Sequence, residues 1–281
     1  MSGAEALLAS WLRSAFALVV LLGIGCTTSV RAEEEAVQPF RFNARLEYAL
    51  AGVGSATWIA SELLKPVLAP EHCRLCGSNE LDLRVRKALR WDNVVRAQRT
   101  AHAMLFVAVP VLSAGSLLAL SIRQGTRNDT KVDAMVVFES FLLTANITAL
   151  AKYSFARRRP FVRAGSEAQR DVLTGPHEDN ISFFSGHTST TFALAVASGA
   201  TASFRGYKYA PVVWAVGMPL AALTGYLSIA ADRHYFTDVL TGALVGSAIG
   251  VLVPWLHRRG ADAHMPSVSA APGTVMFTWV R

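Results

Sequence analysis

The chain has 281 residues, of which 52% are hydrophobic and 17% are charged, and its mean hydropathy is +0.33. A charged fraction this far below the usual quarter disfavours a soluble domain and indicates a membrane protein with one compact domain. The formal net charge is +7, but much of the basic charge stands at the ends of apolar runs, where membrane topology requires it. We therefore expect membrane lipids, and no nucleic acid, as partners.

Residues 1–32 have the pattern of an export signal. Arg13 precedes the apolar run Ala15–Gly25, and Val30-Arg31-Ala32 places small residues at a cleavage site. The run is short for a membrane span, and an uncleaved N-terminal anchor is the alternative. The sequence leaves the choice open.

Residues 33–99 are expected to form a helical N-terminal region. Its apolar stretch Tyr48–Ser61 is bracketed by Glu47 and Glu62 and is short for a span, so it predicts a buried or interfacial helix. Whether residues 45–65 cross the membrane stays open. The following stretch is polar and helix-forming, with a basic face that we expect to be solvated. That face consists of Arg84, Arg86, Lys87, Arg90, Arg96 and Arg99.

Cys73 and Cys76 stand in a Cys-Arg-Leu-Cys pattern in the same region. A single pair lacks the four ligands that a structural zinc site needs. In an oxidising compartment the two thiols are expected to form a local disulfide, with a redox role as the alternative.

Residues 100–259 contain five apolar runs, which predict the membrane-embedded core. One run carries a single acid, Glu139, which should face the bundle interior because a charge facing lipid is costly. The last run has small residues at Gly242, Gly246 and Gly250, which allow close helix packing. The tail 260–281 carries no functional prediction. The predicted spans are Thr100–Ile122, Ala134–Ala151, Gly186–Phe204, Tyr209–Ala231 and Val239–Leu256.

The basic residues between these spans predict the orientation. They gather in loops on one side, which the positive-inside rule places in the cytoplasm. Residues 152–185 and 231–238 then lie on the other face of a bacterial inner (cell) membrane, toward the periplasm or the exterior. The residues that set this bias are Arg123, Arg127, Lys131, Arg205, Lys208, Arg258 and Arg259.

Three polar stretches lie at span ends that a bundle with short connections brings to the same side. In the first, Lys152 supplies a point charge, and Arg159, directly before Pro160, can bind two phosphate oxygens at once. We interpret the neighbouring Arg157 and Arg158 as a basic cluster at the membrane edge.

The second stretch, Ser182–His187, joins a polar loop to an apolar run. Ser185 is a good N-cap residue, and Gly186 lets a ligand approach the backbone closely. The free N–H groups and the dipole of the following helix favour an anion such as phosphate. His187 places a titratable group beside that anion.

The third stretch contains His234 and Asp238, whose spacing of four residues puts them on one helical face. A carboxylate on one ring nitrogen fixes the tautomer and leaves the other nitrogen free to attack. Each stretch alone is weak evidence for a site. Two histidines and several cations on one membrane face are costly unless they bind something, so together they indicate a site.

These residues resemble a known family. Lys-x6-Arg-Pro, Ser-Gly-His and His-x3-Asp before a Gly-rich span are similar, in this order, to the three signature motifs of the type 2 phosphatidic acid phosphatase family. The resemblance covers roughly residues 100–256. That family shares its helical core with vanadium haloperoxidases and bacterial non-specific acid phosphatases. The resemblance therefore implies an all-α, multi-span helical membrane bundle with a phosphatase/haloperoxidase-like core.

The resemblance also implies hydrolysis of a phosphomonoester or pyrophosphate through a phosphohistidine, with no metal or other cofactor. By position, His234 would be the nucleophile, Asp238 its orienting partner, and His187 the acid that protonates the leaving oxygen. The implied partners are a lipid phosphate substrate and membrane lipids, while the oligomeric state is not indicated. The phosphoryl oxygens would be held by Lys152, Arg159, Ser185 and the Gly186 N–H.

The chain departs from the family pattern at one position. The third motif has an arginine six residues before its histidine, and here that residue is Ser228. Losing one preorganised contact of this kind typically lowers a rate ~10²–10³-fold. Arg233 and Arg158 are candidate surrogate cations, although Arg233 would point to a different side of a continuing helix.

Three functions therefore stay open. The first is a phosphatase for a lipid phosphate or lipid pyrophosphate, and the second is a phosphotransferase that passes the phosphoryl group to another acceptor. The third is a catalytically impaired family member that binds anionic lipid, which Ser228 favours more than any other residue does.

Overall fold

A computed structural model of the chain describes residues 40–164, 176–258, 267–271 and 274–278. The predicted signal or anchor at 1–32 lies outside the described residues. The described part is a bundle of helices followed by one short hairpin, in which β1 (Ser267–Ala271) pairs antiparallel with β2 (Thr274–Thr278). The predicted all-α class of the membrane-embedded part is confirmed.

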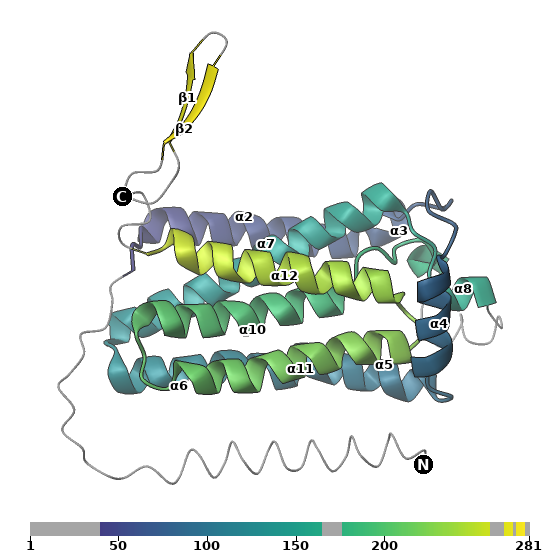
Figure 1. Ribbon diagram of the computed structural model, residues 1–281, viewed down its shortest axis with the longest axis horizontal. Coiled ribbons are helices and arrows are strands. Elements are labelled where there is room, and N and C mark those ends of the chain that lie inside the picture. The colour runs from purple at the N-terminus through teal and green to yellow at the C-terminus, as the bar shows by residue number, and fades with distance from the viewer. Residues whose placement is uncertain (1–39, 165–175, 259–266, 272–273, 279–281) are drawn as a thin grey trace. The chain divides into compact units, whose positions relative to one another are not determined.

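The long helices run side by side (Figure 1). Three short segments are π-helical or 3-10 turns, labelled η. The helices are α2 (Ala44–Leu63), α3 (Lys65–Leu68), α4 (Glu80–Leu89), α5 (Val94–Ala103), η1 (Met104–Ala108), η2 (Pro110–Ala114), α6 (Gly115–Gln124), α7 (Arg127–Phe155), α8 (Pro160–Ala164), η3 (Pro176–Glu178), α10 (Gly186–Arg205), α11 (Ala210–Ala230) and α12 (Phe236–Leu256).

Four helical segments of the described chain are long and apolar enough to cross a membrane: Val94–Gln124, Arg127–Phe155, Ala210–Ala230 and Phe236–Leu256. The chain is thus a multi-pass membrane protein. The first segment joins α5, η1, η2 and α6 into one helix and begins before the predicted start of the span. Its π-helical turns lie around Pro110, which cannot donate a backbone hydrogen bond within the helix.

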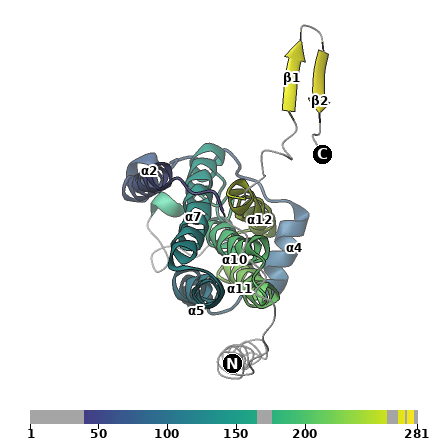
Figure 2. The same cartoon turned by 90° about the vertical axis from the view of Figure 1, so that its left-hand side faces the viewer.

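The predicted span Gly186–Phe204 forms the central helix, α10, and is not among those four segments. The end view in Figure 2 places α10 between α7, α11 and α12, and it packs against all three. Its buried positions include Thr188, Ser189 and Ser198. Because other helices cover most of α10, its small polar side chains meet protein, where they find hydrogen-bond partners, as when the Ser198 hydroxyl donates to the Leu194 carbonyl.

The stretch predicted to be a buried or interfacial helix is α2, which lies along α7 (Figure 1). Within the protein it is mostly not buried, since Leu46, Leu50 and Val53 are each more than half exposed. Of the two predicted alternatives, burial is wrong because α2 packs on the bundle from outside, and the interfacial position stays a prediction. Its outer face has the apolar character of a surface that contacts lipid or another protein.

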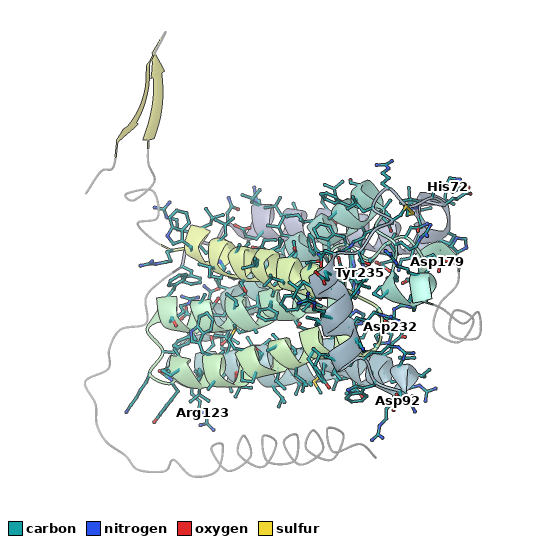
Figure 3. The ribbon with its side chains drawn as sticks, turned by 45° about the vertical axis from the view of Figure 1, so that its right-hand side comes forward. His72, Asp92, Arg123, Asp179, Asp232 and Tyr235 are labelled. Atoms are coloured by element: carbon teal, nitrogen blue, oxygen red, sulfur yellow. A yellow bond between two sulfur atoms is a disulfide. The ribbon has the colours of Figure 1, made fainter. Side chains whose placement is uncertain are left out.

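The two ends of the bundle carry different charged residues. Figure 3 shows Arg123 at one end, and His72, Asp92 and Asp179 toward the other. Arg123 belongs to the last turn of α6, in the basic group that predicted the cytoplasmic side.

The glycines of α12 allow it to lie directly on α10. A Cβ atom on Gly246 would lie 2.1 Å from the Ser189 carbonyl oxygen, and one on Gly250 would lie 2.9 Å from the Ala193 carbonyl oxygen. The predicted close packing of small residues is confirmed. This contact sets the spacing between α10, which carries His187, and α12, which begins just after His234.

We expect Gly246→Ala to lower the thermal unfolding midpoint of the purified protein, because overpacking a tight contact typically costs about 1–3 kcal/mol. The added methyl group would meet backbone, so α10 and α12 would have to separate. Gly52→Ala on α2 is the matched control, since its methyl group would meet nothing within 4 Å. Its midpoint should stay at or slightly above the wild-type value. Equal midpoints for the two variants would contradict this packing.

Candidate active site

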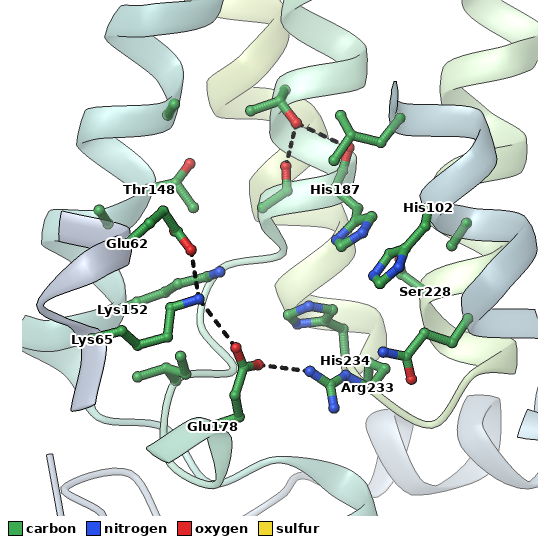
Figure 4. Close-up of a pocket in the computed structure, with 18 of the residues that line it drawn as sticks. Glu62, Lys65, His102, Thr148, Lys152, Glu178, His187, Ser228, Arg233 and His234 are labelled. Atoms are coloured by element: carbon green, nitrogen blue, oxygen red, sulfur yellow. Dashed lines mark hydrogen bonds and ion pairs between the residues drawn. The ribbon is translucent and has the colours of Figure 1, made fainter. Parts of the chain in front are cut away.

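The three polar stretches meet at one end of the bundle around a cavity of about 500 Å³. Figure 4 shows how Lys152 from α7, His187 from α10 and His234, just before α12, point into the same space. The structure thus brings together residues that are far apart in the chain, as the topology predicted. The predicted site residues that line the cavity are Lys152, Arg159, Gly186, His187, Arg233 and His234.

The start of α10 forms one wall of this cavity. Ser185 is the N-cap, and its side chain accepts hydrogen bonds from the Thr188 N–H and the Thr188 hydroxyl. The Lys152 ammonium would lie 3.2 Å from a Cβ atom on Gly186, so this position has little room for a side chain. A cation beside the positive end of a helix is unfavourable unless both face an anion. The arrangement is therefore suited to a phosphoryl group.

His234 is oriented by a backbone carbonyl. Its Nδ1 lies 2.8 Å from the Ser182 carbonyl oxygen and 3.8 Å from the nearer Asp238 carboxylate oxygen. Nδ1 therefore carries the proton and donates a hydrogen bond to the Ser182 carbonyl oxygen. The lone pair of Nε2 is left in the cavity, where Nε2 lies 3.4 Å from an Arg159 nitrogen. The predicted direct contact between Asp238 and His234 is longer than a hydrogen bond.

Asp238 positions His234 indirectly, through Ser182. One carboxylate oxygen accepts hydrogen bonds from the Ser182 hydroxyl at 2.6 Å and from the Tyr235 N–H at 3.0 Å. Ser182 is the residue whose carbonyl orients His234. Asp238 thus fixes the loop that holds the histidine, and it is fully buried while doing so.

The prediction that Arg157 belongs to a basic cluster at the membrane edge is wrong. Arg157 is buried, and its guanidinium donates to Asp238, to Thr237 and, at 2.7 Å, to Asp82 of α4. The prediction failed because Asp82, 75 residues away in the chain, supplies a second carboxylate that no local pattern reveals. Arg157 is therefore committed to this network and is not one of the residues that line the cavity.

We expect Asp82→Ala to destabilise the protein by about 3 kcal/mol, because removing one partner of a buried ion pair leaves the other charge uncompensated. Glu80→Ala is the matched control on the same helix. Glu80 is also paired with an arginine, Arg84, but its side chain is 80% exposed, so its loss should cost no more than about 1 kcal/mol. Unfolding midpoints in detergent test this difference. Equal losses would show that Asp82 does not stabilise Arg157.

Arg233 enters the cavity, although a continuing helix would have pointed it elsewhere. The helix α11 ends at Ala230, and Asp232 takes a left-handed backbone conformation with φ 59°. Arg233 then reaches the cavity that Ser228 also lines, with its guanidinium 2.7 Å from Glu178. The prediction that Arg233 points to a different side is wrong, because the helix does not continue to this residue. The other candidate surrogate, Arg158, is not among the cavity-lining residues.

The turn at Asp232 is held by residues that the sequence analysis placed on a solvated face. Arg86 donates to both Asp232 carboxylate oxygens at 2.6 Å, and Arg90 donates at 3.2 Å. A left-handed conformation is uncommon for a residue other than glycine, and these bonds stabilise it. The basic side of α4 therefore serves to fix the turn that aims Arg233.

Glu178 joins the cations of the cavity, and sequence reasoning missed it. Its carboxylate lies 2.7 Å from Arg159, 2.7 Å from Arg233 and 3.1 Å from Lys65, another residue that no motif indicated. Burial would raise the pKa of Glu178, but the surrounding cations, Arg159 first, hold it below its ordinary value. Three basic side chains therefore converge on one anionic group. Figure 4 shows two of them, Lys65 and Arg233, beside Glu178.

Burial also lowers the pKa values of basic groups in the cavity. Burial and then the charge of Arg159 lower the pKa of Arg233, Glu178 opposes them, and the pKa is about 9 as a result. Burial lowers the pKa of His234 to about 4, an effect that Asp238 offsets only in part. His234 is thus neutral near pH 7, and a neutral imidazole is the form that can act as a nucleophile.

A second residue that the motifs did not indicate is His102 of α5. Its ring stacks on that of His187, with the centroids 4.8 Å apart and the planes 10° from parallel. Nε2 of His187 is buried and has no hydrogen-bond partner among the described residues. His102 escaped prediction because it lies before the region that carries the motifs.

Comparison with known proteins identifies the class. The family model of the PAP2 superfamily matches residues 133–261, which include all three polar stretches. This match confirms the resemblance of the segment to type 2 phosphatidic acid phosphatases.

Two curated relatives match over part of their length. The chain is 32% identical over 114 residues to lipid A 1-phosphatase from Porphyromonas gingivalis, a match that covers 41% of the chain and 21% of that protein. It is 27% identical over 144 residues to a PA-phosphatase related-family protein from Dictyostelium discoideum, covering 48% of the chain and 52% of the relative. The chain thus spans about half the length of these relatives or less.

A solved structure is also similar. It is a transmembrane PAP2-type phosphatidylglycerolphosphate phosphatase from Bacillus subtilis, with 20% sequence identity and a TM-score of 0.44. The match covers 70% of this chain and 94% of that one.

Proposed function

We propose that the protein is a membrane phosphatase that hydrolyses a lipid phosphate or lipid pyrophosphate through a phosphohistidine. The observation that carries this proposal is the cavity itself. Two buried histidines, His187 and His234, face Lys152, Arg159 and Arg233 in one space at the start of a helix. The match to the PAP2 superfamily model and the names of the relatives agree with this reaction class.

In the proposed reaction, Nε2 of His234 attacks phosphorus and the bond from phosphorus to the leaving oxygen breaks. His187 gives that oxygen its proton and then accepts a proton from the water that cleaves the phosphohistidine. Lys152, Arg159 and the first N–H groups of α10 stabilise the charge on the phosphoryl oxygens. No step needs a metal ion.

Arg233 is proposed to replace the arginine that Ser228 lacks. Its guanidinium already binds a carboxylate beside Arg159, which shows that both can hold one anion. A phosphoryl group offers more oxygens to the same cations, so it competes with Glu178 for them. With Arg233 in this place, the residue at 228 no longer favours a catalytically impaired protein.

The rest of the cavity wall supports a lipid as substrate. Apolar side chains from α2, η1 and α7 line it, among them Trp58, Leu105, Phe106 and Phe141. Phe106 is 65% exposed, so this wall continues onto the outer apolar surface of the bundle. Acyl chains in the bilayer therefore have an apolar route to a headgroup held by the cations.

The replacement of the motif arginine can be tested by phosphate release from a panel of lipid phosphates, with EDTA present. We expect Arg233→Ala to lower kcat/KM ~10²–10³-fold, because it removes a preorganised contact to the phosphoryl oxygens. Ser228→Arg should lower the rate as well, since a second guanidinium would crowd Arg233. His234→Ala sets the background.

Arg158→Ala is the matched control for this series, because Arg158 does not line the cavity. Its rate should stay near that of the wild type. If Arg233→Ala keeps the wild-type rate while Ser228→Arg raises it, Arg233 is not the surrogate. If the wild type does not exceed His234→Ala on any lipid phosphate, the proposed hydrolysis is wrong.

The pH dependence of kcat/KM reports the ionisation of His234 in the free enzyme. Since burial lowers its pKa to about 4, protonation should remove the nucleophile only as the pH falls through about 4. If the nucleophile were a histidine with the ordinary pKa of about 6.5, the enzyme would lose activity below that pH. After correction for ionisation of the phosphate, whose second pKa is about 6, we expect a level profile down to about pH 5. An acid limb near pH 6.5 would contradict the assignment of a neutral, desolvated His234.

We propose that the site faces the periplasm or the cell exterior, on the charge bias of the loops. A reporter that is active only outside the cytoplasm should give signal when fused after residue 170. It should give none when fused after Lys208, an exposed residue between α10 and α11 at the other end of the bundle. The opposite pattern would reverse the orientation.

A further inference from the structure

A second cluster of polar residues lies away from the active site, where Glu47 of α2, Glu139 of α7 and His257 at the end of α12 meet. Glu139 precedes Lys152 by 13 residues in α7, which corresponds to about 20 Å along a helix. Asp238 and His257 belong to opposite ends of α12. The cluster therefore belongs to a different region from the active site.

The three side chains are close together and shielded from solvent. His257 Nε2 lies 3.4 Å from a Glu139 oxygen and 3.7 Å from a Glu47 oxygen, and one ligand atom from each residue lies within 4.8 Å of the others. The side chains are 10–13% exposed. The inward direction expected for Glu139 is confirmed, and its partners are now identified.

The tautomer of His257 is set by a backbone contact. Its Nδ1 lies 2.9 Å from the Val253 carbonyl oxygen and donates to it, so Nε2 presents a lone pair to the two carboxylates. Metal-binding histidines are commonly oriented by such a second contact. His257 is 9% exposed, and its Nε2, like one oxygen of Glu139, is buried with no hydrogen-bond partner among the described residues.

Three electron-rich atoms thus face one another in a site of low exposure. Two carboxylates this close repel each other unless a proton or a cation lies between them. Arg41 lines the same cavity, and its backbone N–H donates to the His257 carbonyl oxygen. A divalent ion would neutralise both carboxylates and satisfy the imidazole lone pair together.

We propose that Glu47, Glu139 and His257 bind a divalent transition-metal ion, with Zn²⁺ the best match. A tetrahedral ion with bonds of about 2.0–2.2 Å separates its ligand atoms by about 3.3–3.6 Å, close to the two distances observed. One imidazole and two carboxylates form a ligand set that Zn²⁺ accepts. The adjoining cavity of about 860 Å³ has room for water as a fourth ligand.

The ion would join α2 to α7 and to the end of α12, and it takes no part in the proposed hydrolysis. The inference does not depend on that reaction, because its test measures binding without substrate. Purified full-length protein without a histidine tag is treated with EDTA, transferred to metal-free buffer in detergent and titrated with Zn²⁺ by equilibrium dialysis. Co²⁺ is used in parallel, because its visible absorption reports a tetrahedral site with nitrogen and oxygen ligands.

We expect the wild type to bind about one ion per chain, and Glu139→Gln and Glu47→Gln to bind it at least about tenfold more weakly. Glu80→Gln is the matched control, since it removes a carboxylate that is exposed and paired with Arg84. It should bind like the wild type. Zn²⁺ should also raise the unfolding midpoint of the wild type and of Glu80→Gln, and raise those of the two ligand variants much less.

Either of two results would overturn the proposal. One is a wild type that binds neither ion above the level of Glu139→Gln, which would mean that the carboxylates share a proton. The other is equal binding by all four proteins, which would place the ion elsewhere. If Glu139→Gln does not fold, Glu47→Gln, on the separate helix α2, decides the outcome by the same measurements.

Discussion

The buried guanidinium of Arg157, placed between Asp82 and Asp238, is the interaction on which the rest of the site depends. It joins α4, the end of α7 and the start of α12. Asp238 then holds Ser182, and the Ser182 carbonyl orients His234. A buried ion pair is weak evidence for stability, because desolvation of the charges offsets their attraction. Here its clearest consequence is geometrical, since one chain of contacts leads from α4 to the proposed nucleophile.

The second constraint is the cost of collecting cations in one buried site. One cavity gathers Lys152, Arg159 and Arg233. Two acidic side chains, Glu62 and Glu178, line the same cavity. Burial disfavours each charge, which is why the pKa of Arg233 and that of Arg159 are lowered. Such an arrangement is unfavourable for a purely structural cluster. It is favourable for a site that takes a phosphoryl group with two or more negative charges.

The sequence predicted the parts of this site that depend on local patterns and on topology. The cap at Ser185, the convergence of the three stretches and the close packing at Gly246 follow from local chemistry and from short connections between helices. The role of Arg157 could not be predicted, because its partner Asp82 is distant in the chain. The direction of Arg233 depends on a left-handed turn at Asp232, which no helical periodicity reveals.

The helix α2 carries none of the motifs, yet it contacts the rest of the bundle at three levels. Near its start Glu47 faces Glu139 and His257, and near its middle the Gly54 carbonyl accepts a hydrogen bond from Asn146 at 2.9 Å. At its end the Ser61 carbonyl accepts from Tyr153, next to Lys152, and Trp58 packs edge-on against Phe141. Because Trp58 and Phe141 both line the active-site cavity, the position of α2 sets the width of its apolar wall. An ion that fixes the start of α2 would therefore influence how a lipid enters, through a rigid helix and without touching the reacting groups.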